Sequence, residues 1–265
     1  MYRSFSKIFV QSLKQVKYVP AIVTTFKNWY GFLINHLRIK KDLNEFILRN
    51  GLKIKVDRIN DDGWSPSIIM DICIKKEYGN IKNNSVLIDI GANIGVFSLF
   101  STFKKNNVCY AFEPEKRNFT ILKENLKINN LEKAIIPFNT AVSSVNGENK
   151  LYKTISMSHS LSHVSNEFEI VKTVTLERII KDNNIKYVDY LKIDCEGGEY
   201  DILYNTDKKI FKVINKLLIE YHNVDKSLES NGGHLINYIQ QIGYKIVNHK
   251  IISDSLGIVH AELIN

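Results

Sequence analysis

Residues 86–98 read Val-Leu-Ile-Asp-Ile-Gly-Ala-Asn-Ile-Gly-Val-Phe-Ser, and this stretch decides the fold class. Its first five residues form an apolar run of the kind found in buried parallel strands. Asp89 stands near the end of that run, and Gly91, Asn93 and Gly95 follow it in a Gly-x-Asn-x-Gly turn. Glycines let the backbone bend sharply and let a ligand approach it closely. The residues after the turn predict a helix whose first N–H groups can meet a carboxylate or phosphate.

Strands and helices alternate on both sides of this stretch. The predicted strands cover residues 86–90, 108–112, 134–142, 188–193, 213–220, 244–247 and 257–263. The predicted helices cover residues 67–78, 95–104, 115–129, 176–182 and 234–242, another begins at residue 199, and an inserted antiparallel pair of strands covers 150–154 and 170–174. This alternation is typical of an α/β fold with helices on both faces of a mostly parallel sheet. The last two of the seven strands follow each other without a helix, which predicts an antiparallel C-terminal edge strand.

The N-terminal part of the chain has a different pattern. Residues 1–55 hold 11 of the 36 Lys and Arg residues but only two of the 28 acidic residues, so the rest of the chain is close to neutral. Apolar residues recur at helical spacing on both sides of Pro20, which predicts two amphipathic helices separated at that proline. Asn50-Gly51, between two short apolar strands, predicts a β-hairpin. We expect a basic helical extension over residues 1–44 and a second domain over residues 45–265.

Composition excludes several classes of protein. Hydrophobic residues make up 44% of the chain and charged residues 24%, unlike a disordered chain, a collagen or a multi-span membrane protein. The most apolar window, residues 18–37, includes Lys27 and His36 and is too polar to span a bilayer. The start of the chain lacks the uninterrupted apolar run of a secretory signal, and the three cysteines fit neither a disulfide framework nor a zinc site. We expect a cytoplasmic protein. Peripheral contact of residues 1–40 with an anionic membrane surface and a merely solvated helical surface both remain open.

Glu113 stands about twenty residues after the glycine turn, at the end of the second predicted strand. In an open α/β sheet this position brings a carboxylate beside the turn, where it can accept the protons of both ribose hydroxyls of a nucleoside. The alternative is a capping role at the helix that begins near residue 115. The spacing favours the ribose role.

The turn also indicates which nucleoside cofactor it holds. A dinucleotide-binding turn needs Gly-x-Gly-x-x-Gly, with its third glycine for close packing beneath a pyrophosphate. Counted from Gly91, this chain has Asn93 and Val96 at the second and third glycine positions. S-adenosylmethionine has no phosphate, and its methionine part carries a carboxylate for the turn N–H groups and an ammonium that Asp89 can hold directly or through water. The turn therefore favours S-adenosylmethionine over NAD.

Two further strands end in charged residues. Residues 192–199 read Lys-Ile-Asp-Cys-Glu-Gly-Gly-Glu and place Lys192, Asp194 and Glu196 at the carboxyl end of an apolar strand. Ligands bind at such strand ends in open α/β sheets. Capping of the next helix by its acidic residues is the plain alternative, but capping needs fewer charged groups than are present. The following strand ends at His222, at the same predicted edge.

The motifs D-x-G-A-N-x-G, F-E-P, K-x-D-x-E-G-x-E and I-E-x-H, in this order, resemble those of the FkbM family of S-adenosylmethionine-dependent O-methyltransferases. The likeness covers roughly residues 45–263 and implies a Rossmann-like class I methyltransferase fold with S-adenosyl-L-methionine as cofactor. By the resemblance, Gly91, Asn93 and Gly95 line the methionine end, Glu113 the ribose, and Asn139, Thr140 and Ala141 the adenine, while Asp194 and Glu196 lie beside the transferred methyl group. The family acts on hydroxyls of sugars, glycans and similar metabolites, so a hydroxyl-bearing small molecule or glycan is the expected acceptor.

An acceptor hydroxyl must lose its proton as the new bond forms, so methyl transfer to oxygen calls for a nearby base. The candidates are Asp194, Glu196 and His222, with Lys192 orienting a carboxylate or steadying the acceptor oxygen. We expect Asp194 to be the base or the acceptor-orienting group, because it ends the strand next to the cofactor. A divalent metal on Asp194, Glu196 and Glu220 is chemically conceivable. No ligand spacing demands one, and no metal is predicted.

Three alternatives use parts of the same pattern. An RNA 2'-O-methyltransferase would share the cofactor and explain the basic extension, but the neutral catalytic part lacks the interleaved basic and aromatic residues that nucleic-acid binding favours. An NAD-dependent oxidoreductase is disfavoured by the missing glycines. A non-catalytic nucleoside-binding module would have no need of the carboxylates at residues 194–199. We therefore predict an S-adenosylmethionine-dependent O-methyltransferase, with nucleic acid disfavoured as a partner.

Overall fold

The structure, a computed structural model, describes residues 16–36, 43–56, 64–153, 159–160, 167–223 and 230–264. The chain folds into two compact units that divide between Glu77 and Tyr78. The predicted domain boundary at residue 45 stays a prediction, and the helix predicted before Pro20 lies largely outside the described residues. The three cysteines are unpaired, as expected. Among the described helices, none is both long and apolar enough to cross a membrane.

The first unit contains short helices and one hairpin. Its described elements are α2 (Val19–Thr25), α3 (Trp29–His36), β1 (Glu45–Ile47), β2 (Lys53–Lys55), α4 (Trp64–Ile69) and the π-helix η1 (Met70–Ile74). Pro20 stands in the first turn of α2, where its missing N–H costs no helical hydrogen bond. The helix predicted after Pro20 is divided into α2 and α3 because Asn28 turns to the hairpin. Its Nδ2 donates to the Glu45 carbonyl oxygen at 2.8 Å, and its Oδ1 accepts the Ile47 N–H at 2.9 Å.

The predicted hairpin is confirmed. β1 and β2 pair antiparallel, and Gly51 has the positive φ, 102°, that the turn requires. Phe26 and Phe32 stack with ring centroids 4.2 Å apart, and Phe46 meets Phe32 edge-on at 5.2 Å. All three rings are fully buried. These apolar residues from the helical segment and the hairpin therefore build the core of the first unit.

A seven-stranded sheet forms the centre of the second unit. Its strands are, in chain order, β3 (Val86–Ile90), β4 (Val108–Phe112), β5 (Ile135–Phe138), β10 (Val188–Ile193), β11 (Ile214–His222), β12 (Tyr244–Ser253) and β13 (Leu256–Leu263). Their order across the sheet is β12-β13-β11-β10-β3-β4-β5, with β11, β10, β3, β4 and β5 parallel. The predicted α/β fold with a mostly parallel seven-stranded sheet is confirmed.

The antiparallel strand β13 lies between β11 and β12, so β12 and not the final strand is outermost. The two strands form a hairpin, and either could have paired with β11. Ile258, Val259 and Ala261 of β13 are buried, whereas most of β12 is exposed. The more apolar strand therefore takes the inner position, where both of its edges are paired.

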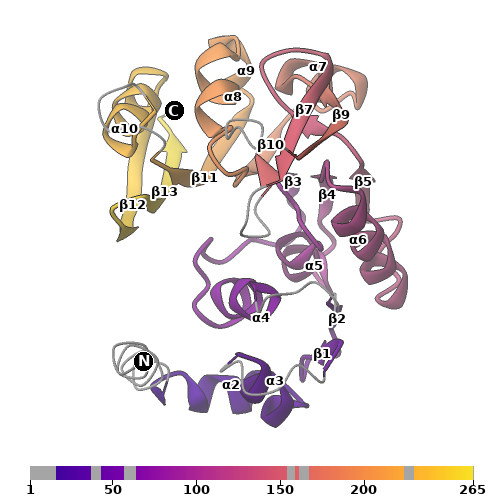
Figure 1. The fold of residues 1–265 in the computed structure, drawn as a ribbon. Coiled ribbons are helices and arrows are strands. Elements are labelled where there is room, and N and C mark those ends of the chain that lie inside the picture. Colours follow the sequence, from indigo (N-terminus) through magenta and orange to yellow (C-terminus); the bar gives the residue numbers. More distant parts are fainter. Residues whose placement is uncertain are drawn as a thin grey trace. The chain divides into compact units, whose positions relative to one another are not determined.

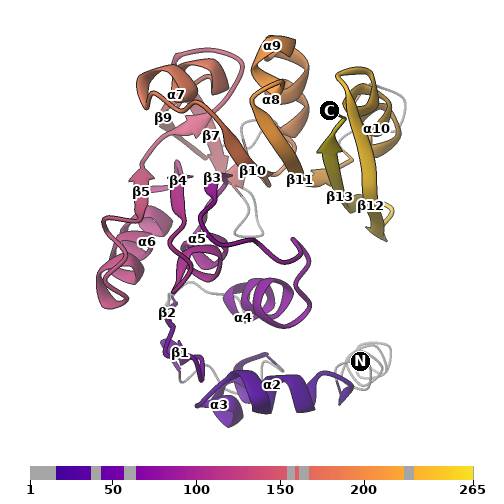
Figure 2. The same cartoon turned by 180° about the vertical axis from the view of Figure 1, so that it is seen from behind.

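Helices cover the two faces of the sheet. They are α5 (Val96–Thr102), α6 (Lys116–Ile128), α7 (Leu176–Asp182), α8 (Glu199–Asn205), α9 (Lys208–Phe211) and α10 (Gly232–Gln241). Figures 1 and 2 show α5 and α6 on one side of the sheet and α7, α8 and α10 on the other. The chain moves outward in one direction from β3 to β5 and in the opposite direction from β10 to β11. Because parallel crossovers are right-handed, the helices of the two halves lie on opposite faces.

The strand predicted over residues 134–142 is two strands in different sheets. β5 ends at Phe138, and β6 (Ala141–Val142) joins a four-stranded sheet with β7 (Gly147–Lys153), β8 (His159–Ser160) and β9 (Phe168–Val174), in the order β6-β9-β7-β8. Asn139 causes the break, because its Nδ2 donates to the carbonyl oxygens of residues 113 and 114 and turns the chain out of the main sheet. The antiparallel pair predicted in the insertion is confirmed as β7 and β9.

A reversal of chain direction between β3 and β10 sets the position of the candidate site. β3 leads to β4 on one side, and β10 leads to β11 on the other. Open α/β sheets bind ligands at such reversals, outside the carboxyl ends of the strands. The Asp194 N–H donates to the Ile90 carbonyl oxygen at 3.1 Å, which ties the two strand ends together. The glycine turn and the carboxylates singled out in the sequence therefore meet at neighbouring strand ends.

Candidate active site

The turn after β3 depends on left-handed backbone conformations. Gly91, Asn93 and Gly95 have φ angles of 74°, 52° and 88°. A Cβ at Gly91 would lie 1.8 Å from the carbonyl oxygen of Asp194, so only glycine allows the ends of β3 and β10 to approach so closely. Asn93 tolerates its conformation because its Oδ1 accepts the Ile94 N–H at 2.7 Å. Gly91 and Asn93 stay partly exposed, so the turn presents its main chain at this edge.

Glu113 contacts the same turn. Its Oε2 accepts the Asn93 N–H at 2.8 Å, and its Oε1 accepts the Glu115 N–H at 2.9 Å. The capping role weighed for Glu113 belongs to Glu115, whose side chain accepts the Asn118 N–H at the start of α6. Burial raises the pKa of Glu113 to about 7, although both backbone hydrogen bonds lower it. Each oxygen keeps a lone pair beyond its backbone bond, so the ionised carboxylate can still accept two hydroxyl protons.

Asp89 is more enclosed than the sequence indicates. Its side chain is fully buried: Oδ2 accepts the Ser98 hydroxyl at 2.6 Å, and Oδ1 lies 3.3 Å from Lys192 Nζ. Oδ2 thus binds a residue of α5, and Oδ1 faces the ammonium of a residue of β10. The structure leaves Asp89 no exposed surface for the expected direct contact with a ligand ammonium.

The three residues expected at the adenine follow β5. Asn139 uses its side-chain amide within the protein, donating to the carbonyl oxygens of residues 113 and 114 at 2.9 and 2.8 Å. Thr140 is half-buried, and Ala141 is buried in the second sheet. Asn139 therefore fixes the loop that carries Glu113.

Lys192 joins the strand ends from within. Its Nζ lies 3.4 Å from Asp194 Oδ2 and donates to the Gly91 carbonyl oxygen at 2.8 Å, in addition to its contact with Asp89. Burial lowers the pKa of Lys192, but the charges of Asp194 and Asp89 outweigh that effect, so the pKa is raised and the ammonium stays charged. Because Lys192 is only 3% exposed, it can orient Asp194 but cannot reach an acceptor oxygen.

Tyr78 is a site residue that no sequence motif indicates. Its hydroxyl lies 3.1 Å from Asp194 Oδ2 and 3.1 Å from Glu220 Oε2. A phenol has one proton and can donate to only one of these carboxylates. Burial and the charge of Asp194 raise the pKa of Glu220 to about 8. Near pH 7 a largely protonated Glu220 can therefore donate to Tyr78 while Tyr78 donates to Asp194.

His222 lies between two glutamates. Its Nδ1 is 3.1 Å from Glu199 Oε1, and its Nε2 is 3.4 Å from Glu196 Oε2. Burial lowers the pKa of His222, but the hydrogen bond and charge of Glu199, with Glu196, outweigh that effect and raise it to about 10. A charged imidazole cannot accept a proton, so the base role weighed for His222 is not available near neutral pH. Burial raises the pKa of Glu196 to about 7, although His222 lowers it. Glu196 thus changes protonation close to neutrality.

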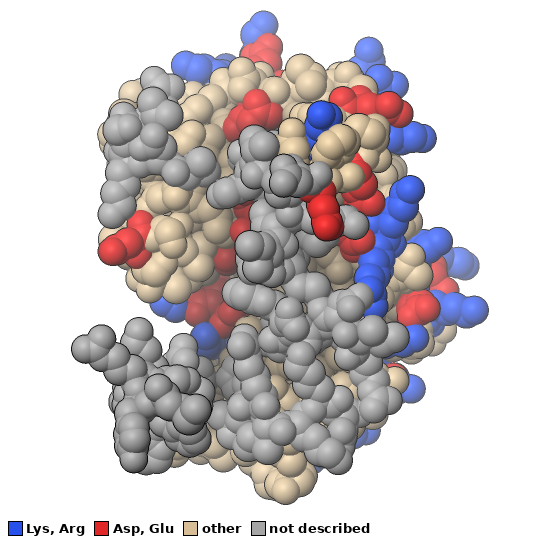
Figure 3. Space-filling view, in the orientation of Figure 1, with Lys and Arg blue, Asp and Glu red and all other residues tan. Residues whose placement is uncertain are grey.

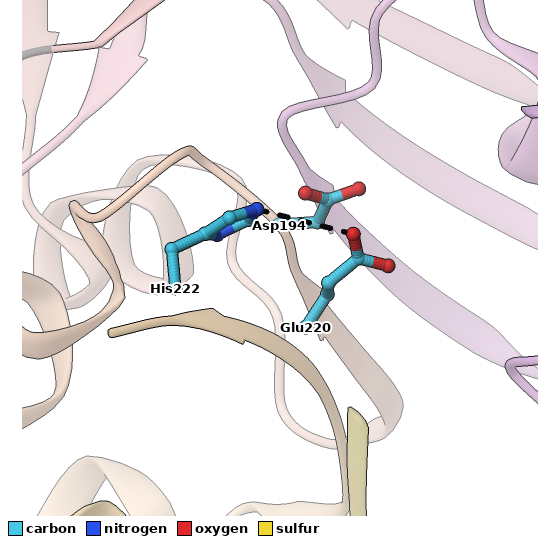
Figure 4. Close-up of side chains that lie close together, drawn as sticks. All are labelled: Asp194, Glu220 and His222. Carbon is cyan, nitrogen blue, oxygen red and sulfur yellow. Dashed lines mark ion pairs between the residues drawn. The ribbon is translucent and has the colours of Figure 1, made fainter. Parts of the chain in front are cut away.

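Asp194, Glu220 and His222 point toward one another (Figure 4). Each offers one ligand atom, and the three atoms lie within 4.8 Å of one another. Carboxylate and imidazole donors can hold a divalent cation. His222 would first have to lose its proton, and Asp194 already faces Lys192. The protein's own cations, Lys192 and His222, already balance these carboxylates, and the expectation of no metal stays a prediction.

The geometry and the motifs agree with a comparison to known families. The sequence model described as "Methyltransferase FkbM domain" matches residues 89–246, more than half of the chain. The chain belongs to the FkbM methyltransferase family. The predicted family and methyltransferase activity, together with S-adenosylmethionine as the methyl donor, are thereby confirmed. The acceptor and the roles of individual residues are not given by the family.

This FkbM-family chain is similar to several named proteins. It is 24% identical over 213 residues to Methyltransferase 1 of Beauveria bassiana (strain ARSEF 2860). The match covers 71% of this chain and 82% of that protein. It is 24% identical over 212 residues to the 31-O-demethyl-FK506 methyltransferase FkbM of Streptomyces tacrolimicus. This match covers 68% of this chain and 80% of that protein. A solved structure of M. jannaschii TYW2 in complex with AdoMet matches with a TM-score of 0.46 and 19% identity over 84% of this chain and 88% of that one.

Proposed function

We propose that this methyltransferase transfers a methyl group to a hydroxyl of a sugar, a glycan or a similar small metabolite. The observation that carries the proposal is Glu196, a carboxylate with a pKa of about 7 that follows the strand end packed against the glycine turn. A hydroxyl acceptor needs a base that is ionised yet ready to take a proton, and a pKa near the working pH meets that need. The name of the Streptomyces tacrolimicus relative, which specifies a 31-O position, supports an oxygen acceptor.

The donor site follows from the turn and from Glu113. When bound, S-adenosylmethionine supplies a methyl group on an electrophilic sulfonium. Gly91, Asn93 and Gly95 would line its methionine end, where the partly exposed Gly91 and Asn93 permit close approach. Glu113 would accept the ribose hydroxyls on the lone pairs that its two backbone hydrogen bonds leave. Residues 139–141 would lie toward the adenine, since Asn139 holds the Glu113 loop.

The acceptor would meet Glu196 and Asp194 in different roles. The Glu196 side chain is 39% exposed, compared with 28% for Asp194 and none for Glu199. Its φ of 54° is a left-handed conformation that a non-glycine residue adopts only under local constraint. Asp194 accepts a hydrogen bond from Tyr78 and lies 3.4 Å from the Lys192 ammonium, and these two contacts hold its carboxylate in place. We assign Glu196 as the base and Asp194 as the residue that orients the acceptor. His222 contacts Glu196 and Lys192 contacts Asp194, and neither is assigned a contact with the acceptor.

The charge distribution favours a small acceptor over RNA. Residues 78–265 hold 22 Lys and Arg and 21 Asp and Glu. On the face drawn in Figure 3, basic and acidic side chains of this unit are interspersed. RNA binding draws much of its affinity from clustered positive charge along the phosphate backbone. This unit offers a mixed surface instead.

Incubation with S-adenosylmethionine carrying a radiolabelled methyl group tests the proposal. Separate arms contain glycans, small hydroxylated metabolites, lipids and RNA. We expect label in a glycan or metabolite fraction, bound as an ether that survives mild alkali. Label found only in RNA, or lost to alkali as from a methyl ester, would contradict the proposal.

Three matched variants connect the labelling to the site. Glu196→Gln should lower the rate of labelling at least about tenfold, since general-base catalysis contributes roughly 100-fold or more. Asp194→Asn should raise the acceptor KM as well as lower the rate. Glu132→Gln removes an exposed acid from the turn before β5 and should change neither quantity.

We also propose that residues 1–40 contact an anionic membrane surface through their basic side chains, ahead of a methyltransferase domain at residues 45–265. The apolar residues Ile22, Phe26 and Phe32 are buried in the first unit, so the attraction would be electrostatic. Such binding weakens with salt. Flotation with vesicles containing phosphatidylserine should depend on residues 1–40 and decline as salt is raised. Equal flotation without that segment would contradict this proposal.

A further inference from the structure

Glu199 differs from Glu196 and Glu220 in being fully buried. It is the first residue of α8, and its two oxygens turn back to the loop before the helix. Oε1 accepts the Cys195 N–H at 3.0 Å, and Oε2 accepts the Gly197 N–H at 2.9 Å. The carboxylate therefore fixes the backbone on both sides of Glu196.

The same carboxylate also orients His222. A charged imidazole carries a proton on both ring nitrogens, so His222 Nδ1 donates to Glu199 Oε1 at 3.1 Å. The opposite ring nitrogen, Nε2, then lies 3.4 Å from Glu196 Oε2. His222 therefore connects the buried Glu199, at its Nδ1, to the half-exposed Glu196, at its Nε2. Capping of α8 alone would explain the two backbone contacts but not the contact with the ring.

We propose that Glu199 is a positioning residue that holds the His222 imidazole against Glu196, so that the three side chains act together on the acceptor proton. The inference rests on the proposed function. In the transfer, the acceptor oxygen bonds to the methyl carbon while the carbon–sulfur bond breaks. The electron pair of that bond stays on sulfur, which becomes a neutral thioether, and the hydroxyl proton passes to the Glu196 carboxylate. Without a cation at His222, Glu196 would keep its own proton to higher pH and could not accept another.

Several charged groups face the His222 ring. Glu199 comes from α8, Glu196 from the preceding turn and Asp194 from the end of β10. Glu220, on the same strand as His222, has its Oε1 3.9 Å from Nε2. On the other side, β13 contributes only the apolar Leu256 opposite His222. Glu199, Glu196 and Asp194 favour the imidazolium, and Glu199 is the one hydrogen-bonded to it at Nδ1.

Side-chain NMR of the histidines tests the role of Glu199 without an acceptor. In the wild-type chain the His222 ring should remain charged through pH 9, because its pKa is about 10. In Glu199→Gln the His222 pKa should fall by at least about one pH unit, since loss of one charged hydrogen bond is worth that much or more. Asp201→Asn should leave it unchanged. A His222 pKa that is the same in wild type and Glu199→Gln would overturn the proposal.

Catalysis provides a second, independent readout. With the acceptor fraction identified by labelling, the acidic limb of the rate profile should move to higher pH in His222→Asn, because this variant lacks the cation that lowers the pKa of Glu196. Glu199→Gln should lower the maximal rate instead, because His222 stays charged near neutral pH but is no longer held against Glu196, and Glu199→Asp should restore part of that rate. An acidic limb that does not move in His222→Asn overturns the proposal even if Glu199→Gln fails to fold.

Binding of S-adenosylhomocysteine separates this inference from the proposed function. Glu199→Gln and His222→Asn should bind it within about threefold of wild type, because neither residue contacts the proposed donor site. If wild type does not bind it at all, the proposed donor site is wrong, whereas the histidine titration still decides the role of Glu199. If binding is normal and the titration does not move, only the role of Glu199 is wrong.

Discussion

Glu113 is buried, yet each of its oxygens accepts one backbone hydrogen bond and has capacity for another. Its burial raises the pKa to about 7. Ionisation of this buried carboxylate costs free energy, and hydrogen bonds from two hydroxyl groups would offset that cost. A ribose diol would supply those two hydroxyl groups.

Replacement of Glu113 should weaken donor binding. In Glu113→Gln the dissociation constant of S-adenosylhomocysteine should rise about 10–100-fold, because hydrogen bonds to a charged group are worth roughly 1.5–3 kcal/mol. In wild type, binding should also weaken as the pH falls from 8 to 6, since protonated Glu113 accepts less well, and the variant should lose this pH dependence. Titration calorimetry measures both effects. The exposed Glu132→Gln is the control, and equal affinity of Glu113→Gln and wild type would refute the ribose role.

Removal of divalent cations should leave methyl transfer unchanged. Lys192 and His222 already balance the carboxylates of the cluster, and a metal on His222 would have to displace its proton. Rates of labelling are to be compared before and after treatment with EDTA. A rate that falls with EDTA and returns with Mg²⁺ or Mn²⁺ would show that Asp194, Glu220 and His222 hold a metal after all.

At the scale of elements, the close approach of β3 and β10 depends on Gly91. In Gly91→Ala the new Cβ would meet the Asp194 carbonyl oxygen, and the φ of 74° would strain the backbone as well. Gly147→Ala is a matched control, because its φ is also positive, at 145°, while nothing lies within 4 Å of a Cβ there. Gly91→Ala should unfold at a lower temperature than Gly147→Ala and should lose most affinity for S-adenosylhomocysteine. Equal melting temperatures would show that the two strand ends can move apart to accommodate a Cβ at residue 91 without loss of stability.

Elements that are buried on both faces could be predicted from the sequence. β3 and β10 are mostly apolar, with Asp89, Asp189 and Lys192 as their charged residues, and their predicted bounds, 86–90 and 188–193, match the structure. The predicted strand 134–142 is equally apolar, but Asn139 divides it through hydrogen bonds to residues distant in sequence. A local pattern does not contain such bonds, so the second sheet could be predicted only in part.

The same limit applies to the candidate site. Asp194, Glu196 and His222 were indicated because each stands at or just after the end of an apolar strand. Tyr78 precedes a loop and has no pattern around it, so its contacts with Asp194 and Glu220 could not be predicted. The proposed role of Glu199 could not be predicted either, because an acidic residue in the first turn of a helix is already explained by its interaction with the helix dipole.

At the scale of the whole molecule, the site makes stability depend on pH. Folding raises the pKa of Glu113 and Glu196 from 4.5 to about 7, and that of Glu220 from 4.5 to about 8. It raises the pKa of His222 from 6.5 to about 10. A raised pKa means that the native state holds its proton more tightly, so the contribution to stability is complete below the unfolded pKa and is lost as the pH rises through the folded value.

The free energy of unfolding should therefore fall as the pH rises. The glutamates lose their contribution between about pH 4.5 and 8, and His222 loses its own between about pH 6.5 and 10. Urea denaturation of the protein without added donor should show a free energy of unfolding that decreases steadily between pH 5.5 and 9.5. A stability that rises over this range would contradict the assigned pKa directions.

We propose that the methyl donor binds at the carboxyl ends of β3 and β4, with its ribose on Glu113. A crystal structure of the protein with S-adenosylhomocysteine tests this donor site. Both ribose hydroxyls should lie within hydrogen-bonding distance of the Glu113 carboxylate, and the sulfur should face Asp194 and Glu196. A ligand bound elsewhere, or one whose ribose lies away from Glu113, would refute the proposed donor site.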